Sequence, residues 1–98
     1  MSASSEATAT SATATSATAT VVLPANLHAR PAGRLARVAA EFTSTITIEH
    51  AGKTINPTGV LAVMGLGATA GTAVTITADG PDAEPAVRSL AEVLGNAT

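Results

Sequence analysis

The chain has 98 residues, a formal net charge of −2, one aromatic residue and no cysteine. This length allows one small domain, and a negative charge with a single ring for stacking argues against a nucleic-acid binder. Without cysteine there is no disulfide framework and no thiolate zinc site, so we expect a reduced, cytoplasmic setting. No apolar run approaches the roughly 20 residues that a membrane-spanning helix needs, so we expect no membrane insertion.

The first 17 residues are almost entirely Ala, Thr and Ser, with a five-residue rhythm, ATATS, visible along them. Low-complexity segments of this kind offer little apolar surface that a core could bury. We therefore expect residues 1–17 to be a disordered extension and residues 18–98 to be the folded domain.

A short strand is predicted at 20–23, where an apolar run stops at Pro24. The loop that follows leads to His28, and a helix is predicted from Ala29 to Phe42. Proline is tolerated in the first turn of a helix, so Pro31 indicates that the helix begins at about Ala29. Apolar residues recur at helical spacing and predict one buried stripe, formed by Leu35, Val38, Ala39 and Phe42.

A β-hairpin and a short helix are predicted next. Residues 45–49 alternate β-branched side chains, Ala51 and Gly52 offer a tight turn, and residues 53–55 would form the second strand. Glycines punctuate the apolar run at 59–67, which suits a helix of about two turns.

Another strand and a last helix complete the domain. Residues 72–78 alternate again, and Asp82 is expected to cap a helix that ends at Gly95. Half-polar strands, with helices that each bury one stripe, predict an antiparallel sheet covered by helices on one face. The expected fold class is therefore a small α+β domain of two layers.

The residues around the first helix start suggest phosphate chemistry. His28 directly precedes the helix, next to backbone N–H groups that have no intrahelical partner, and such a position binds phosphate well. The amides of Ala29 and Arg30 and the Arg30 guanidinium would supply donors to phosphate oxygens. We infer a histidine that carries a phosphoryl group.

Three of the five basic residues lie in the same predicted helix, at 30, 34 and 37. This spacing places Arg30, Arg34 and Arg37 on one face, which begins beside His28. The row is either an ordinary solvated helix face or a docking surface for acidic partners, and its position next to a phosphate site favours docking.

Two stretches resemble the HPr family, the histidine-containing phosphocarriers of the bacterial phosphoenolpyruvate-dependent sugar phosphotransferase system. They are LHARPA at 27–32 and GKTINPTGVLAVMGLG at 52–67, and they occur at the family's usual distance. The resemblance implies an open-faced β-sandwich of βαββαβα topology, with a four-stranded antiparallel sheet and three helices on one face. It also implies that His28 accepts a phosphoryl group on Nδ1 from phosphorylated Enzyme I and passes it to enzyme II A domains. A protein of this kind is a substrate of Enzyme I rather than an enzyme, and we expect a monomer without cofactor or metal.

Docking would use apolar residues of the short helix beside the first helix. The predicted docking residues are Gly33, Arg34, Arg37, Val60, Leu61 and Met64. The alternative is that the apolar members belong to the core, as we expect for Val63 and Leu66, whereas methionine suits a surface that meets several partners.

Three other residues are candidate sites. Many Gram-positive relatives begin the short helix with a serine that a dedicated kinase phosphorylates, and here that position is Gly59. Thr58 precedes it, but its side chain is expected to point differently, so no regulatory site is predicted. His50 has no second ligand nearby in sequence and is interpreted as a turn residue rather than a metal ligand.

Two alternatives keep the fold and change the role. The chain would be the carrier of a nitrogen-related phosphotransfer branch, or a regulatory module that docks through Val60, Leu61 and Met64 without phosphotransfer. The residues His28 and Arg30 argue against the second, because a pure binding module requires neither. A hydrolase or metalloenzyme is disfavoured, because no carboxylate, serine or cysteine lies near His28 in sequence.

Overall fold

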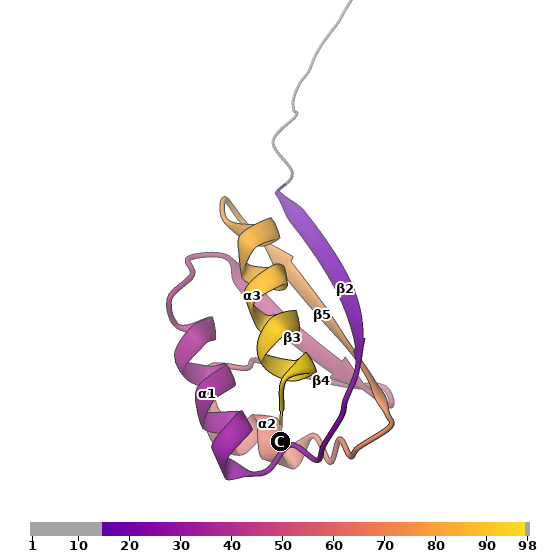
Figure 1. Ribbon diagram of the computed structural model, residues 1–98. Coiled ribbons are helices and arrows are strands. Elements are labelled where there is room, and N and C mark those ends of the chain that lie inside the picture. Colours follow the sequence, from indigo (N-terminus) through magenta and orange to yellow (C-terminus); the bar gives the residue numbers. More distant parts are fainter. Residues whose placement is uncertain (1–14, 98) are drawn as a thin grey trace, which may run out of the picture.

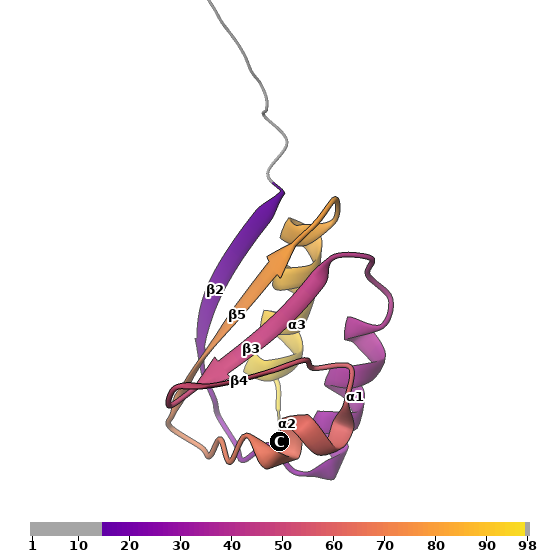
Figure 2. The same ribbon diagram turned by 180° about the vertical axis from the view of Figure 1, so that it is seen from behind.

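A computed structural model describes residues 15–97, which form two layers (Figure 1). A four-stranded antiparallel sheet, in the order β2-β5-β3-β4, is covered by three helices on one face. Figure 2 shows the other face of the sheet, which no helix of the described residues covers. The predicted α+β fold is confirmed. In chain order the elements are β2 (Ser16–Val22), α1 (Ala29–Ala39), β3 (Thr45–His50), β4 (Lys53–Ile55), α2 (Val60–Gly65), β5 (Ala73–Asp79) and α3 (Ala83–Gly95).

Strand β2 begins earlier than predicted. It starts at Ser16 rather than Thr20, and both Ser16 and Ala17, which the sequence suggested were part of the extension, pair with β5. An edge strand needs an inward-facing side chain only at every second residue, and half-buried Ala17 and Ala19 pack against the core. The Ala-Thr alternation therefore serves as a strand here. The remaining disorder prediction, for residues 1–14, lies outside the described residues.

Helix α1 begins at Ala29, as predicted, but ends at Ala39 rather than Phe42. Leu35 and Ala39 are buried, while Val38 and Phe42 are half-buried and pack against the core. The predicted stripe therefore does face the sheet. Its last member, Phe42, contributes from the loop that follows the helix.

The hairpin is confirmed. Strands β3 and β4 pair from Ile48 opposite Ile55 to His50 opposite Lys53, which leaves a two-residue turn. Both turn residues have positive φ, at 51° for Ala51 and 81° for Gly52, as a tight hairpin turn that follows the twist of the strands requires.

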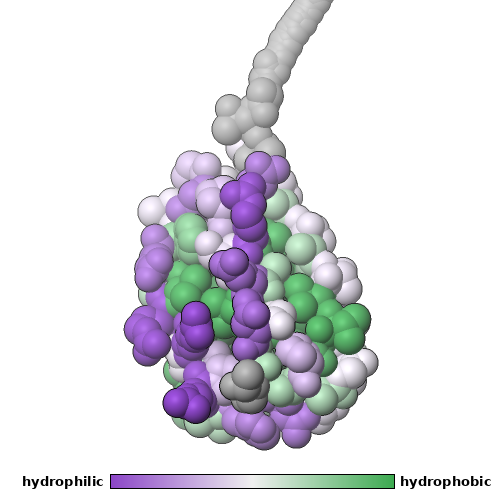
Figure 3. All heavy atoms as spheres, viewed as in Figure 1, coloured by the Kyte–Doolittle hydropathy of each residue, from purple (hydrophilic) through white to green (hydrophobic). Residues whose placement is uncertain are grey.

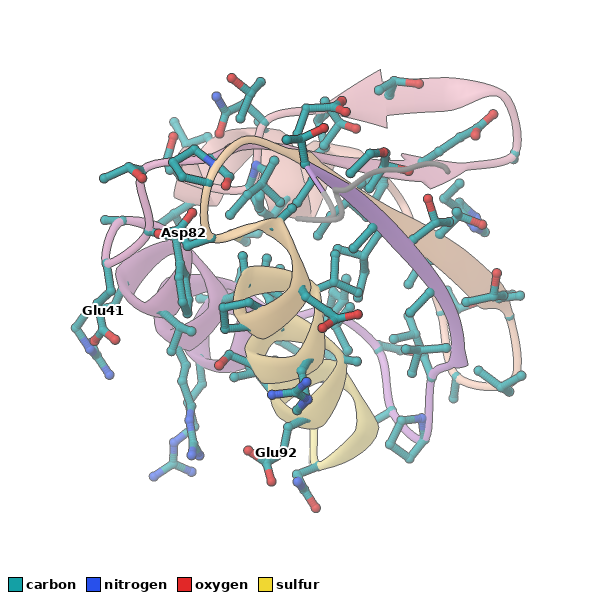
Figure 4. All side chains as sticks on the ribbon, turned by 90° about the horizontal axis from the view of Figure 1, so that it is seen from above. Glu41, Asp82 and Glu92 are labelled. Carbon is teal, nitrogen blue, oxygen red and sulfur yellow. The ribbon has the colours of Figure 1, made fainter. Side chains whose placement is uncertain are left out.

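Asp82 precedes α3 but does not cap it with its side chain, so the predicted role is corrected. The carboxylate instead accepts hydrogen bonds from the N–H groups of Thr43, at 2.9 Å, and Ser44, at 2.8 Å, and from the Ser44 hydroxyl. It thereby joins the loop before α3 to the loop that follows α1 (Figure 4). The Ser44 hydroxyl and the Thr43 N–H lower the pKa of Asp82 from 3.8 to about 2.

The core lies between the helices and the sheet. Alternate residues of β5 face the helices, and α3 is tilted across β2 and β5 (Figure 1). The largest fully buried side chains are Leu23, Leu35, Ile48, Val63, Val74, Ile76, Leu90 and Leu94. Truncating one of these leucines to alanine is expected to lower the free energy of unfolding by about 2–5 kcal/mol.

Candidate functional site

His28 is the exposed N-cap residue of α1, with φ −76° and ψ −177°. The first backbone hydrogen bond of the helix runs from the Ala32 N–H to the His28 carbonyl oxygen, at 3.0 Å. The N–H groups of Ala29 and Arg30 precede that bond, and Pro31 has none, so two donors at the positive end of the helix are free for an anion. An anion attached to the His28 ring would lie within reach of them.

The loop that carries His28 is held by hydrogen bonds to the segment between α2 and β5. The Leu27 N–H donates to Ala68 O at 3.2 Å, and the Ala70 N–H donates to Asn26 Oδ1 at 2.8 Å. The carbonyl oxygen of Asn26 also accepts the His28 N–H, at 3.0 Å. Asn26 thus ties the backbone of His28 to a second loop, although the histidine side chain stays exposed.

The sequence did not identify Asn26 as a functional residue. Asparagine in a loop commonly bonds to backbone groups, and that was the available signal. Its partner, however, is 44 residues away along the chain, so no local pattern points to it.

The predicted arginine row exists on one face of α1, where Arg30, Arg34 and Arg37 are all exposed. The three side chains line a depression between α1 and the end of α3. The one ion pair among residues 15–97 is Arg88 with Glu84, at 4.0 Å, so none of the three has a carboxylate partner within that range. Their charge is therefore available to an anionic ligand or partner.

Helix α2 packs beside α1 (Figure 1) and presents apolar side chains to solvent. Leu61 is 83% exposed and Met64 is 40% exposed, whereas Val63 and Leu66 are buried, as the sequence suggested. Val60 is half-buried, as is Gly33 on α1. An exposed apolar pair next to a cationic helix suits docking better than it suits a monomer surface.

Gly59 is the N-cap residue of α2, and Thr58 precedes it with its side chain turned back along the loop. The hydroxyl of Thr58 donates to Asn56 Oδ1 at 2.8 Å, and its N–H donates to the same oxygen at 3.0 Å. A Cβ built on Gly59 would lie 3.5 Å from the nearest atom, Ala62 Cβ, which is an ordinary contact. The backbone would therefore admit a side chain at 59, and this chain has none.

His50 is not a turn residue, as the sequence suggested, but the last residue of β3, where it pairs with Lys53 and is half-buried. Its Nδ1 lies 3.3 Å from the carbonyl oxygen of Ala73. No group of three His, Asp or Glu side chains within residues 15–97 has the arrangement that a metal ion would need. Among the described residues, none of the helices is both long enough and apolar enough to cross a membrane.

Chemically, this arrangement offers a solvent-exposed imidazole, two backbone N–H donors and one guanidinium. Within residues 15–97, the hydrogen bonds that hold His28 and its loop involve no carboxylate, serine or cysteine side chain. Such a set can hold a phosphate and present it to another protein. Because His28 is exposed to solvent, a partner must complete the surroundings of the reacting phosphorus atom.

Comparisons with known proteins agree on one family. A family model described as the PTS HPr component phosphorylation site matches residues 15–96. The crystal structure of the phosphocarrier protein HPr from Bacillus anthracis is 36% identical, with a TM-score of 0.75, over 81% of this chain and 96% of that one. The histidine-containing phosphocarrier protein of Mycoplasma is 34% identical, with a TM-score of 0.76, over 83% and 100%.

A third similar structure is the Bacillus subtilis catabolite repression protein Crh, which is 36% identical with a TM-score of 0.66 over 76% of this chain and 85% of that one. That protein is described as a dimer with a swapped domain.

Proposed function

Because this chain belongs to the HPr family, the phosphocarriers of the phosphotransferase system, we propose that its His28 accepts a phosphoryl group from phosphorylated Enzyme I and passes it to enzyme II A domains. The observation that carries the proposal is the exposed position of His28 at the N-terminus of α1, beside free N–H groups and Arg30. The chain acts in the cytoplasm, as a monomer, and as a carrier rather than a catalyst.

In the transfer, a lone pair on Nδ1 of His28 attacks the phosphorus atom of the donor. A nitrogen–phosphorus bond forms as the bond between phosphorus and the donor breaks, and the electron pair of the broken bond stays with the donor. The N–H groups of Ala29 and Arg30, with the Arg30 guanidinium, stabilise the phosphoryl oxygens during and after transfer. The reverse step moves the group to an acceptor.

Docking brings donor and acceptor in turn to the same exposed histidine. Leu61 and Met64 provide an apolar contact that partners can bury, and Arg34 and Arg37 attract acidic partner surfaces. Val60 and Gly33 complete this surface. One docking face for several partners explains why methionine, which adapts its shape, stands in it.

The direct test is phosphorylation by Enzyme I with labelled phosphoenolpyruvate. We expect one acid-labile label per chain, absent in His28→Ala and retained in His50→Ala, the matched control at the second histidine. Thermal unfolding of both variants checks that each is folded. A folded His28→Ala protein that still accepts the label, or a wild-type chain that accepts none, would refute the proposal.

Arg30 and the docking surface are tested by steady-state kinetics with the chain as the substrate of Enzyme I. Replacing Leu61 with Glu is expected to raise the KM about tenfold or more with a smaller change in kcat, because Leu61 contributes to binding of the partner and not to the transfer step. Arg30→Gln is expected to lower kcat mainly, because its charge acts on the transferring group. A kcat effect for Leu61→Glu and a KM effect for Arg30→Gln would contradict the roles assigned to these residues.

A nitrogen-related branch is the first alternative, and it keeps the same chemistry at His28. It is distinguished by competition: the phosphorylated chain is offered sugar-specific and nitrogen-related enzyme II A domains together. Faster transfer to sugar-specific acceptors supports the main proposal.

A regulatory binding module without phosphotransfer is the second alternative. The exposed Leu61 and Met64 and the similarity to Crh, described as a catabolite repression protein, favour it. The labelling experiment separates the two, because a module of this kind would bind a partner through α2 without accepting phosphate on His28.

Gly59 leaves no hydroxyl at the start of α2, and the Thr58 hydroxyl is bonded to Asn56. We therefore propose that an HPr-type serine kinase does not modify this chain, whereas Gly59→Ser creates an acceptor. Incubation of both proteins with such a kinase and labelled ATP tests this, and phosphate on Thr58 of the wild-type chain would contradict it.

A further inference from the structure

We propose that the groove between α1 and the end of α3 binds a small organic molecule that carries two or more phosphate groups. The groove has a volume of about 590 Å³, within the range of small-molecule sites. His28 is not among the residues that line it, so the groove adjoins the proposed phosphoryl site and shares Arg30 with it, while its other wall comes from the end of α3.

The rim of the groove supplies the charge. Arg30, Arg34 and Arg37 follow one another along the helix, over a rise of about 10 Å at 1.5 Å per residue. Within residues 15–97 none of them is paired with a carboxylate, so their N–H donors are open to a ligand. Guanidinium groups bind phosphate oxygens in pairs of parallel hydrogen bonds, and a row of three is matched by more than one phosphate.

Apolar side chains contribute the smaller part of the groove's lining, at its floor. Pro31 and Ala97 are buried, and Val93 is half-buried and packs against the core. Figure 3, seen from the same side as Figure 1, shows hydrophobic surface between hydrophilic ridges along α1 and α3. An inorganic ion would use the rim alone, whereas a ligand with a carbon body also covers this floor.

Asn96 limits the kind of body further. Its Nδ2 donates one hydrogen to the carbonyl oxygen of Glu92 at 2.8 Å, which leaves the second Nδ2 hydrogen and the amide oxygen to meet a ligand. A hydroxyl group on the ligand can bond with either of them. The groove therefore suits a nucleoside or similar polar ring that carries a chain of phosphates.

Arg30 links this site to His28, since it stands at the end of the groove and two residues from the histidine. A ligand that holds the Arg30 guanidinium takes it away from the phosphoryl group, so occupancy of the groove slows phosphoryl transfer. This consequence rests on the proposed function of His28, whereas binding itself does not.

Binding is tested by titrating the ¹⁵N-labelled chain, unphosphorylated, with ATP, tripolyphosphate and adenosine while its amide resonances are recorded. We expect saturable shifts with ATP in both 30–37 and 93–97, at least threefold weaker binding of tripolyphosphate, and no saturable shifts with adenosine. The double variant Arg34→Gln, Arg37→Gln is expected to weaken ATP binding at least tenfold. Arg88→Gln, which removes another exposed arginine on α3 outside the groove, is the control and should bind ATP as the wild type does.

No saturable shift, shifts confined to α1, equal binding of tripolyphosphate, or ATP binding that survives in the double variant would overturn the proposal. Because the titration needs neither Enzyme I nor a functional His28, its failure is separate from failure of the phosphocarrier function. The labelling assay with and without ATP then measures the effect on transfer.

Discussion

The two ends of the helical layer differ in how their polar groups are used. At one end, the side chain of Asp82 accepts three hydrogen bonds from Thr43 and Ser44, and Gly80 packs directly against Ser44. At the other end, His28 extends into solvent, with two backbone N–H groups beside it that precede the first hydrogen bond of α1. At the first end the polar groups are paired with one another, and at the second the two N–H donors stay available to the phosphoryl group that we propose His28 carries. The bonds around Asp82 and the candidate site at His28 thus lie at opposite ends of the helical layer. Substitutions at one end should therefore leave the other end unchanged.

Among the substitutions that test this comparison, Gly80→Ala is expected to have the largest effect on stability. Gly80 has φ +145°, and an added Cβ would lie 2.6 Å from Ser44 Oγ and 2.7 Å from Ser44 Cα. Strain and crowding together should lower the free energy of unfolding by about 2–4 kcal/mol, measured by urea denaturation. Phosphate acceptance per folded molecule should not change, because His28 lies at the far end. If phosphate acceptance falls by more than the loss of folded protein, the two ends of the helical layer are not independent.

Asp82→Asn should lower the melting temperature by several degrees at pH 7. The pKa of Asp82 is about 2 in the folded chain and 3.8 ordinarily, so the carboxylate form stabilises the fold. This contribution is fully present above pH 4 and is lost as the pH falls from about 4 to 2. The difference in melting temperature between wild type and variant should therefore shrink across that interval, and a difference that is constant down to pH 2 would contradict the assignment.

Asn26→Ala tests the side-chain hydrogen bond that ties the loop of His28 to the segment between α2 and β5. Removing Oδ1 leaves the Ala70 N–H without its acceptor, which should cost about 1 kcal/mol in unfolding free energy. Phosphoryl transfer should slow by up to about tenfold, because the backbone of His28 is less well positioned. Asn26→Asp keeps an acceptor oxygen and should restore most of both losses; equal effects from the two variants would exclude a role for this hydrogen bond.

Gly33→Ala is expected to have the smallest effect, and it changes the stability at the His28 end of the helical layer. Gly33 lies within α1, and a methyl group added to its Cα would meet no atom within 4 Å, so alanine should raise helix propensity without a clash. We expect an increase of about 0.5–1 kcal/mol in unfolding free energy, measured by urea denaturation. A decrease would show that the start of α1 tolerates no further side chain.

Periodicity accounts for most of what could be predicted about the fold. The start of α1, the hairpin turn and the end of α3 at Gly95 depend on signals within a few residues, and all three are where the sequence placed them. The start of β2 was missed because an Ala-Thr alternation is ambiguous on its own: it becomes a strand when β5 offers a partner. The predicted cap at Asp82 failed for the same reason, since the competing donors of Ser44 lie 38 residues away.

The candidate site also combines features that local sequence predicts with features that only tertiary contacts produce. The sequence by itself determined that His28 stands at the start of a helix with Arg30 beside it, because helix starts and i, i+4 spacing are local properties. Only the tertiary structure decided that Asn26 anchors that histidine to a second loop, that Asp82 locks the opposite end, and that the arginine row forms one rim of a groove with α3. Each of these depends on contacts between residues far apart along the chain, which packing of the whole core selects and no local pattern contains.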